Sequence, residues 1–324
     1  MKRFLKGLAA LLAVLVILLV WMFWPARLPI AALPAELGLP AANTPADMAI
    51  YALPTGAMHS QAMLAYRGGP PGESRNFTMT AFLVRHPRGD LLIDSGFGSQ
   101  VDAQFAQLAP LMQMTSTYSK EMPARDQLVD AGIDPASLAG VLLTHAHWDH
   151  VSGMTDLPGI PAWLPESEAD FVRSEAPMAA VAHALPGLEL HPYAFADAPY
   201  LGYPRSLDVW GDGSIIVVPA SGHTPGSVVI FVTLPDARYA FVGDIVWQSE
   251  GIERPAERPW IARHLVDQDA DQVREQISHL AALHKKFPQI AMVPAHDLRP
   301  VATMARLGPR ESARNDESAA TPSD

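Results

Sequence analysis

The stretch Thr144–His150 reads THAHWDH and follows the apolar run Val141–Leu143. It places four potential metal ligands, three imidazoles and one carboxylate, within six positions. Side chains at these spacings cannot all project one way from a regular helix or strand, so the stretch predicts a tight loop at a strand end. A single histidine among the 12 in this chain would indicate a solvated or hydrogen-bonded side chain. Four ligand-type residues together favour a metal site instead, with zinc as the first choice and iron or manganese as alternatives.

Three further ligand-type residues follow downstream, each just after a strand-like apolar segment. His223 lies in SGHTPGS, Asp244 ends FVGD, and His296 follows the apolar run in MVPAHD. The intervals between them are long enough for separate strands to converge on one edge of a sheet. We therefore expect the ligands to come from loops on a rigid scaffold.

In this order, HxHxDH followed by His, Asp and His resembles the signature of the metallo-β-lactamase superfamily, over roughly Thr78–Leu298. The resemblance implies an α/β fold of the αββα sandwich type, with two mixed sheets and helices outside, and two bound metal ions. It also implies a ligand set in which the first metal is held by His145, His147 and His223, the second by Asp149, His150 and His296, and Asp244 bridges them.

Two cations in such a site activate a water and polarise the carbonyl or phosphoryl oxygen that it attacks. Asp149 and Asp244 are the candidate catalytic carboxylates, and Asp149 could handle the proton. The chain has no Cys, which excludes a thiol nucleophile and thiolate ligands. His147 stands where the di-iron flavoprotein branch of the family has Glu, so hydrolysis is favoured.

Four residues beside the ligands are candidates for supporting roles, each with a plainer alternative. Asp94, in LLIDSGFG, matches the family's early Asp that hydrogen-bonds to the metal site, although Asp before Ser-Gly is also ordinary turn chemistry. Asp297 either orients the preceding histidine or begins the next loop. Trp148 and Trp247 either wall a substrate pocket or pack in the core.

The HTPG form around His223 resembles lactone and thioester hydrolases of the superfamily. In its homoserine-lactone hydrolases a Tyr follows the bridging Asp, whereas this chain has Trp247 there. Indole has an N–H donor and no hydroxyl, which argues against a lactonase. Tyr193, Tyr200 or Tyr203 are the candidates to replace that hydroxyl.

Residues 1–24 read as a signal-anchor. Lys2, Arg3 and Lys6 precede an uncharged apolar run to Trp24, within the range of about 17 to 25 residues for a membrane-spanning helix. Because basic flanks stay in the cytoplasm, the catalytic part is expected outside it, in the periplasm of a Gram-negative cell. A cleaved signal peptide, which would give a secreted protein, and a buried core helix are the alternatives.

The rest of the chain divides by composition into three parts. Residues 25–49 are rich in Pro and Ala and predict an extended tether rather than a packed element, 50–309 form the hydrolase domain, and 310–324 predict a disordered tail. We expect strands at Thr78–Val84, Leu91–Ile93, Ser214–Val218, Ser227–Val232 and Ala240–Val242, and a helix from Asp269 to just before Pro288. The segments Gln104–Met122 and Glu175–Asp212 fit this pattern least and are candidate lids over the site, with core packing or a surface helix as the alternative.

The formal net charge is −11 although the first 24 residues carry three basic side chains and no acidic one. So acidic a domain repels nucleic acid, which argues against the nucleases of the superfamily. The sequence thus predicts a membrane-anchored, extracytoplasmic hydrolase with two zinc ions, acting on a small lactone, thioester or other ester. The alternatives are a β-lactamase of the same fold, a mononuclear iron oxygenase and a non-catalytic metal-binding module.

Overall fold

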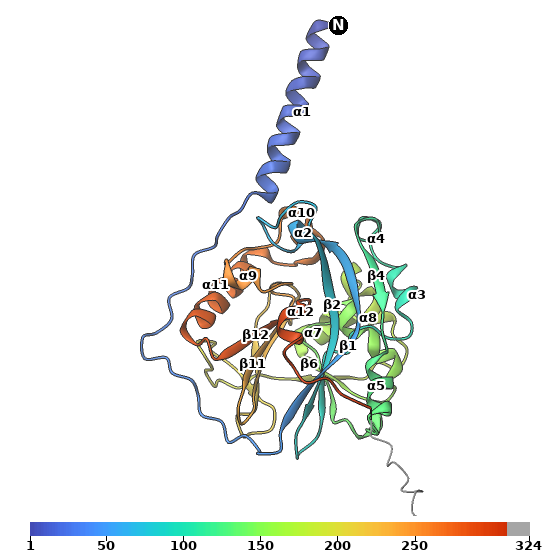
Figure 1. Ribbon diagram of the computed structural model, residues 1–324, viewed down its shortest axis with the longest axis vertical. Coiled ribbons are helices and arrows are strands. Elements are labelled where there is room, and N and C mark those ends of the chain that lie inside the picture. The colour runs from blue at the N-terminus through green and yellow to red at the C-terminus, as the bar shows by residue number, and fades with distance from the viewer. Residues whose placement is uncertain (310–324) are drawn as a thin grey trace, which may run out of the picture.

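The computed structural model describes residues 1–309 and shows two stacked β-sheets with helices on both outer faces (Figure 1). This is the αββα arrangement that the resemblance implied. The expected disordered tail, 310–324, lies outside the described residues. The longer sheet has the strand order β4-β1-β2-β3-β5-β6-β7, and the shorter has β12-β11-β10-β9-β8.

The strands of the longer sheet are β1 (Ala49–Gln61), β2 (Ser74–Arg85), β3 (Leu91–Ile93), β4 (Thr117–Lys120), β5 (Gly140–Leu142), β6 (Ala162–Pro165) and β7 (Leu190–Tyr193). Those of the shorter sheet are β8 (Leu207–Asp208), β9 (Ile215–Pro219), β10 (Val228–Thr233), β11 (Arg238–Gly243) and β12 (Ile290–Pro294). Each sheet is mixed: β3, β5, β6 and β7 run parallel, as do β11 and β12, and the other pairs are antiparallel.

The α-helices are α1 (Lys2–Phe23), α2 (Ala62–Ala65), α3 (Val101–Phe105), α4 (Pro110–Thr115), α5 (Ala124–Asp130), α6 (Trp148–Val151), α7 (Glu166–Arg173), α8 (Ala180–Ala184), α9 (Glu250–Glu253), α10 (Trp260–Val266), α11 (Ala270–Lys286) and α12 (Leu298–Val301). Short 3-10 helices lie at Pro135–Ser137, Ser152–Asp156 and Pro177–Ala179. The five expected strands and the expected long helix correspond to β2, β3, β9, β10, β11 and α11; the ends of β3 agree, and the other ends shift by one to four residues. Asp269 caps α11 by accepting hydrogen bonds from two backbone N–H groups of its first turn.

Apolar side chains on alternate strand positions fill the space between the sheets. Phe82 and Leu142 of the longer sheet meet Ile230 and Phe241 of the shorter one, and all four are almost fully buried. Successive strand residues point to opposite faces, so the remaining apolar side chains of the strands pack against the outer helices. Ile277 of α11 is one of the helix residues that they contact. Burial on both faces explains why β10 reads as a continuous apolar run.

The helix α1 projects away from the domain (Figure 1) and buries none of its residues. It contains an 18-residue window with a mean hydropathy of 2.6, so its length and composition suit a membrane span. A signal sequence passes the same test.

The segment 25–48 is extended, as predicted, but it is packed against the domain. Leu28, Leu33, Leu37 and Leu39 contact the apolar cluster beneath α11, and the Leu28 N–H donates to the carbonyl of Pro255 at 2.7 Å. The prediction of an unpacked tether is therefore wrong. These leucines have no regular spacing, so no periodic pattern marked them as buried.

Candidate metal centre

The seven predicted ligands meet at one edge of the sandwich. The His145–His150 loop follows β5, and His223, Asp244 and His296 follow the ends of β9, β11 and β12. All seven side chains are buried, with exposed fractions from 1% to 8%. Four separate strand ends therefore build one enclosed cluster of imidazoles and carboxylates.

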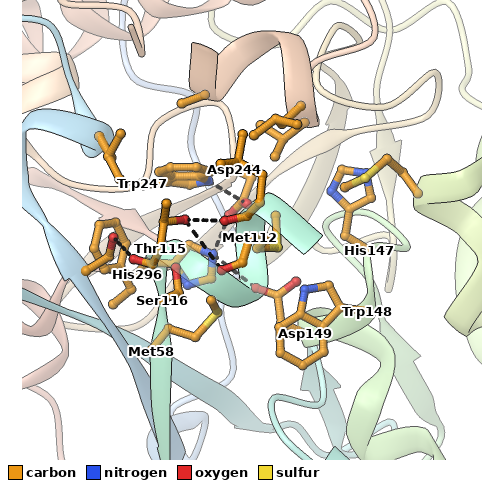
Figure 2. Close-up of a pocket in the computed structure, with 18 of the residues that line it drawn as sticks. Met58, Met112, Thr115, Ser116, His147, Trp148, Asp149, Asp244, Trp247 and His296 are labelled. Carbon is orange, nitrogen blue, oxygen red and sulfur yellow. Dashed lines mark hydrogen bonds and ion pairs between the residues drawn. The ribbon is translucent and has the colours of Figure 1, made fainter. Parts of the chain in front are cut away.

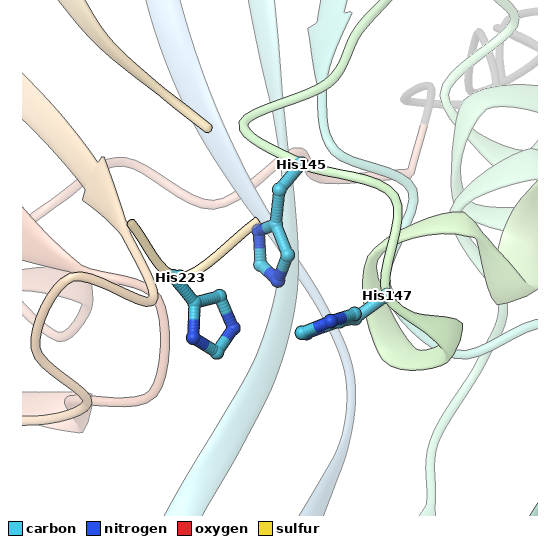
Figure 3. A group of neighbouring side chains, drawn as sticks. All are labelled: His145, His147 and His223. Atoms are coloured by element: carbon cyan, nitrogen blue, oxygen red, sulfur yellow. The ribbon is translucent and has the colours of Figure 1, made fainter. Parts of the chain in front are cut away.

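The ligand atoms form three groups, each with its atoms within 4.8 Å of one another. The groups are His145, His147 and His223 (Figure 3), then His145, His150 and Asp244, then Asp149, His150 and His296. The first and third groups match the two ligand sets that the resemblance implied. Their geometry fits two cations, held chiefly by neutral nitrogen and carboxylate oxygen.

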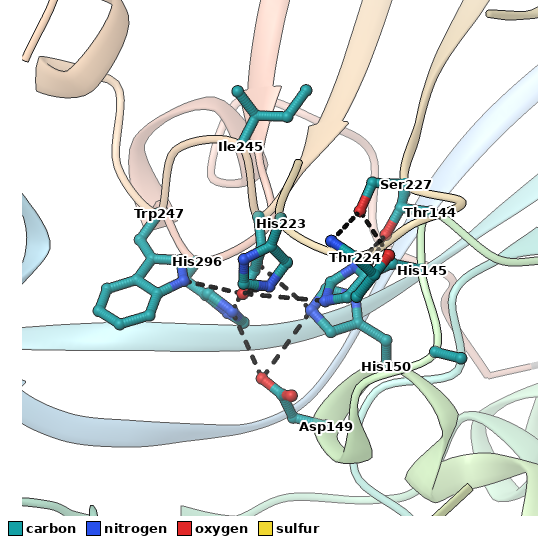
Figure 4. Close-up of polar contacts among 12 residues, drawn as sticks. Thr144, His145, Asp149, His150, His223, Thr224, Ser227, Ile245, Trp247 and His296 are labelled. Atoms are coloured by element: carbon teal, nitrogen blue, oxygen red, sulfur yellow. Dashed lines mark hydrogen bonds and ion pairs between the residues drawn. The ribbon is translucent and has the colours of Figure 1, made fainter. Parts of the chain in front are cut away.

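Asp244 lies between these two ligand sets, with one oxygen facing each. Figure 4 shows Asp149 of the second set between the rings of His150 and His296. The Oδ2 atom of Asp244 lies 3.5 Å from His223 Nε2 and 4.0 Å from His145 Nε2. Its Oδ1 lies 2.9 Å from His296 Nε2 and 3.4 Å from His150 Nε2. The two oxygens of Asp244 therefore lie within reach of both ligand sets.

The Nδ1 atoms of four of the histidines face outward to fixed partners. His150 Nδ1 lies 2.8 Å from Asp94 Oδ2, His223 Nδ1 lies 2.8 Å from Asp267 Oδ1, and His296 Nδ1 lies 3.0 Å from a backbone carbonyl of β2. The remaining contact is His145 Nδ1 to the neighbouring threonine hydroxyl at 3.1 Å. Such contacts set ring orientation and aim each Nε2 inward.

Several inward-facing atoms have no hydrogen-bond partner among residues 1–309. They are the Nε2 atoms of His145, His150 and His223 and the Oδ1 atom of Asp244. Buried polar atoms are rarely left unpaired, because each costs the free energy of its lost hydration. Divalent cations coordinated by these atoms would remove that cost, so the residues present fit a two-metal centre.

The electrostatics of the cluster also suit metal ligands. Burial, together with neighbouring imidazoles, holds the pKa of His145 and of His147 well below the ordinary value, so both rings are neutral. Burial opposes ionisation of Asp244, but the positive charge of His296 and His150 outweighs it and lowers the pKa of Asp244 well below its usual range. Neutral imidazole and ionised carboxylate are the forms that bind metal. Burial opposes protonation of His150, His223 and His296 as well, but neighbouring carboxylates outweigh it and raise the pKa of all three, so bound cations would have to displace protons from these rings.

The two predicted supporting carboxylates differ in what they contact. Asp94 accepts from the backbone N–H of Thr144 at 2.7 Å and from its hydroxyl at 2.8 Å, which ties the metal-binding loop to the end of β3. Asp297 contacts Ser249 and Arg299 and caps α12, while its neighbour's ring is oriented by the carbonyl of Thr78. Asp297 therefore begins the next element, and the prediction that it supports the metal site is wrong.

A buried carboxylate that the sequence analysis missed joins two metal-binding loops. Glu168 of α7 accepts from the Ala146 N–H at 2.6 Å, from the Thr224 hydroxyl at 2.8 Å and from the Gly226 N–H at 2.8 Å. Its side chain is inaccessible to solvent, and burial raises its pKa despite these donors. In the sequence ESEADFVR it resembles the solvated acidic residues around it, so no sequence signal marked it.

A second missed pair lies behind the cluster. Arg258 forms a buried ion pair with Asp267, which also contacts His223 Nδ1, and it donates to the carbonyl of Asp244 at 2.7 Å. The Arg258 guanidinium also lies 4.9 Å from the ring of Trp247. The Arg258 side chain thereby helps to fix the loops that carry Asp244 and His223.

A largely apolar pocket adjoins the ligands (Figure 2). Its lining residues are Met58, Ser60, Leu64, Phe77, Met79, Leu111, Met112, Thr115, Ser116, His147, Trp148, Asp149, Met178, Asp244, Trp247, Ile261, Ala262, Leu265, Val266 and His296. Neither Lys nor Arg belongs to this lining, which lies wholly within residues 1–309. Its shape and composition suit an uncharged substrate with an apolar part.

Both predicted tryptophans line the pocket, and each also packs against other rings. The indole N–H of Trp247 donates to Asp244 Oδ2 at 2.8 Å, and Trp148 lies 5.3 Å from the ring of Phe97. Tyr193, Tyr200 and Tyr203 do not line the pocket, so the idea that one of them supplies the missing hydroxyl there is wrong.

The two candidate lids behave differently. The segment 104–122 supplies α4, which lines the pocket through Leu111, Met112 and Thr115, and β4, which pairs with β1. The segment 175–212 instead forms the edge strands β7 and β8 of the two sheets, and only Met178 from it reaches the pocket. The second segment therefore serves mainly the fold.

Comparison with known proteins agrees with this geometry. The sequence model of the metallo-β-lactamase superfamily matches residues 77–296. The N-acyl homoserine lactonase AttM of Rhizobium radiobacter is 24% identical over 199 residues, covering 59% of this chain and 73% of that protein. A probable metallo-hydrolase of Mycobacterium tuberculosis is 25% identical over 261 residues, covering 71% and 81%.

Solved structures share the fold at low sequence identity. An N-acyl homoserine lactone hydrolase with the product N-hexanoyl-L-homoserine at its catalytic metal centre aligns with a TM-score of 0.62 and 16% identity, covering 79% of this chain and 96% of that one. The dizinc quorum-quenching lactonase AidC aligns with a TM-score of 0.52 and 16% identity, covering 82% and 95%.

Proposed function

The chain belongs to the metallo-β-lactamase superfamily and is a metallo-hydrolase of lactonase-like type, and we propose that it hydrolyses a small lactone or other ester with an apolar acyl part. One observation carries this proposal. A bridging carboxylate and two sets of buried ligands open onto a pocket lined largely by Met, Leu, Ile and aromatic side chains, without Lys or Arg. Thioesters fit the same site.

The proposed metal ligands are His145, His147 and His223 on one side, Asp149, His150 and His296 on the other, and Asp244 between them. Two divalent cations, which we propose to be zinc, would supply an activated water and polarise the substrate carbonyl. Asp149 is both a ligand candidate and part of the pocket wall, which supports a role for its carboxylate in passing a proton to the leaving oxygen.

The pocket lining argues against two related chemistries. β-Lactams and phosphodiesters carry an anionic group, and a pocket that recognises them would offer a Lys or Arg to pair with it. Neither cation is among the lining residues, so only the proposed metal ions would be left to pair with such an anion. An uncharged ester is therefore favoured over either substrate.

We further propose that α1 anchors the protein in a membrane with the catalytic domain outside the cytoplasm. Support comes from the apolar span behind Lys2, Arg3 and Lys6. Alkaline extraction of membranes and protease digestion of spheroplasts test this placement. A shortened protein in the soluble periplasmic fraction would instead indicate a cleaved signal peptide.

The central test measures metal content and turnover together. Purified full-length protein is assayed on acyl lactones, an acyl thioester, a β-lactam and a phosphodiester, alongside Asp244→Asn and the control Asp236→Asn. Asp236 is exposed in the turn between β10 and β11. We expect ester turnover in the wild type and in the control, and a loss of at least about a hundredfold in Asp244→Asn, because the carboxylate lies between both ligand sets.

Three results would redirect the assignment. A fully metal-loaded wild type that hydrolyses none of the substrates indicates a non-catalytic metal-binding module. Turnover of the β-lactam alone indicates a β-lactamase. Iron in place of zinc, with consumption of oxygen, indicates an oxygenase.

A further inference from the structure

The end of α1 is fixed to the domain beside the pocket. Arg67, in the loop between α2 and β2, donates to the carbonyls of Trp21 at 2.9 Å and Trp24 at 3.2 Å, and its guanidinium lies 5.5 Å from the Trp21 ring. The Gly68 N–H donates to the carbonyl of Phe23 at 3.1 Å. These contacts set the direction in which α1 leaves the domain.

An ion pair with a buried glutamate fixes the side chain of Arg67 in turn. Arg67 pairs with Glu257 at 3.3 Å, and Glu257 also pairs with Arg263 of α10 and Arg274 of α11. Glu257 is buried in the segment leading into α10. The base of α1 is therefore connected through ion pairs to the helix that forms one wall of the pocket.

Elements at this same end of the domain supply the pocket walls away from the metal ligands. Leu64 comes from α2, Leu111 and Met112 from α4, and Ile261 and Leu265 from α10. Figure 1 shows α2 and α10 directly at the base of α1, and α4 at the same end of the domain. The pocket is thus walled by the elements nearest to the apolar helix.

Apolar side chains on these elements face outward. Met114 of α4 is 82% exposed and Trp260 at the start of α10 is 45% exposed. The sequence of α4, PLMQMT, contains no charged residue. In water these side chains are unfavourably placed, whereas Trp and Met are stable at the boundary between lipid chains and headgroups.

We propose that α4 and the start of α10 rest on the lipid surface of the membrane that α1 spans, and that the pocket takes an amphiphilic ester directly from that bilayer. The inference rests on the proposed function in treating α1 as an anchor. The occupant of this surface is a lipid bilayer, because the helix that would cross it leaves from the same end. The chain is acidic overall, so it has no net electrostatic attraction to anionic lipids. The proposed contact therefore depends on burial of apolar side chains and does not require anionic lipid.

The chain offers a direct probe because it contains no cysteine. Full-length Met114→Cys, carrying a polarity-sensitive fluorophore, is reconstituted into phosphatidylcholine vesicles. The matched control is Val129→Cys, since Val129 is 51% exposed on α5, which Figure 1 places at the end of the domain away from α1. We expect a blue-shifted emission, quenched by brominated lipid chains and insensitive to salt, only for the label at position 114.

A kinetic arm tests substrate entry. Met114→Glu and Val129→Glu are compared on a short-chain ester dissolved in water and on a long-chain ester dissolved in the vesicles. Met114 is outside the pocket lining, so both variants should match the wild type on the soluble ester. Met114→Glu should lower the rate on the vesicle ester by about tenfold, because a carboxylate opposes docking on lipid.

The outcomes separate the two proposals. A label at position 114 that reports water, in an enzyme that still hydrolyses soluble ester, overturns the membrane contact and leaves the proposed function standing. A lipid-quenched label in a protein that hydrolyses no ester supports the contact and overturns the proposed function. Equal rates for both Glu variants on the vesicle ester exclude entry from the bilayer.

Discussion

Replacing Glu168 by Gln tests whether one buried carboxylate aligns the metal-binding loops. Oε1 of Glu168 accepts from the Ala146 N–H, and Oε2 accepts from the Thr224 hydroxyl and the Gly226 N–H. Ala146 separates two of the proposed ligands, and Thr224 follows His223. Gln has nearly the same shape but only one acceptor oxygen.

The cost follows from counting these hydrogen bonds. If the amide oxygen takes the place of Oε2, its NH₂ group faces the Ala146 N–H, donor against donor. If it takes the place of Oε1, the NH₂ group faces the Gly226 N–H. Either way one buried N–H loses its partner, which costs about 1–3 kcal/mol of unfolding free energy. The neutral amide is easier to bury than a carboxylate, which keeps the loss within that range.

A functional cost accompanies the stability cost, because the two loops carry all three histidines of one ligand group. Loss of a contact that orients metal ligands lowers metal affinity by about 10- to 100-fold. Metal affinity is measured by competition with a chromophoric chelator, and stability by the midpoint of urea unfolding of the metal-free protein. The matched control is Glu166→Gln on the same helix, where the carboxylate is 64% exposed and pairs with Arg173 at the surface. An ion pair between two solvated side chains contributes little to stability, so the control should leave both quantities unchanged.

Two results would refute this reasoning. Metal affinity and a urea midpoint equal to those of the wild type would show that the carboxylate organises nothing. A lower midpoint with unchanged metal affinity would show that Glu168 stabilises the fold without aligning the ligands.

Three further predictions concern the same centre. Asp267→Asn should lower the unfolding free energy by about 3 kcal/mol, measured by urea unfolding, because it leaves Arg258 buried without an anionic partner. It should also weaken metal binding at His223, measured by chelator competition, because the Asp267 carboxylate contacts that ring. Removing metal with a chelator should lower the thermal midpoint in scanning fluorimetry, since a ligand at about 100 times its dissociation constant stabilises the folded state by about 2.7 kcal/mol. Trp247→Phe should change ester turnover while the urea midpoint stays within about 1 kcal/mol, because the variant loses the indole N–H to Asp244 but keeps an aromatic ring beside Arg258; a large loss of stability would show that the residue serves packing alone.

The ligand cluster was predictable because its information is local. In the His145–His150 loop the ligand types are adjacent in sequence, and His223, Asp244 and His296 each follow an apolar strand that ends at the same sheet edge. Strand periodicity and residue type were enough to bring them together. Apart from Asp94, the residues that contact the ligands from behind could not be identified from the sequence.

The contacts behind the ligands depend on long-range packing that leaves no local pattern. Glu168 is separated by more than 50 residues from Thr224, and its neighbours on α7 are solvated acidic residues. Asp267 lies 44 residues from His223 and resembles an ordinary helix-preceding Asp. Asp297 shows the opposite error. It is next to His296 in the sequence, which suggested a contact with that ring, but its side chain caps α12 instead.

The packed segment 25–48 decides how the pocket is oriented. Under the proposal that α1 is a membrane anchor, a free tether would have let the domain turn in any direction relative to the bilayer. Instead Leu28 is held against the domain and Arg67 holds the base of α1, so the helix and the pocket form one unit. In the proposed anchored protein, orientation relative to the bilayer would thus follow from packing on both sides of Trp24, and breaking the Arg67 contacts should free the domain without altering the proposed metal ligands.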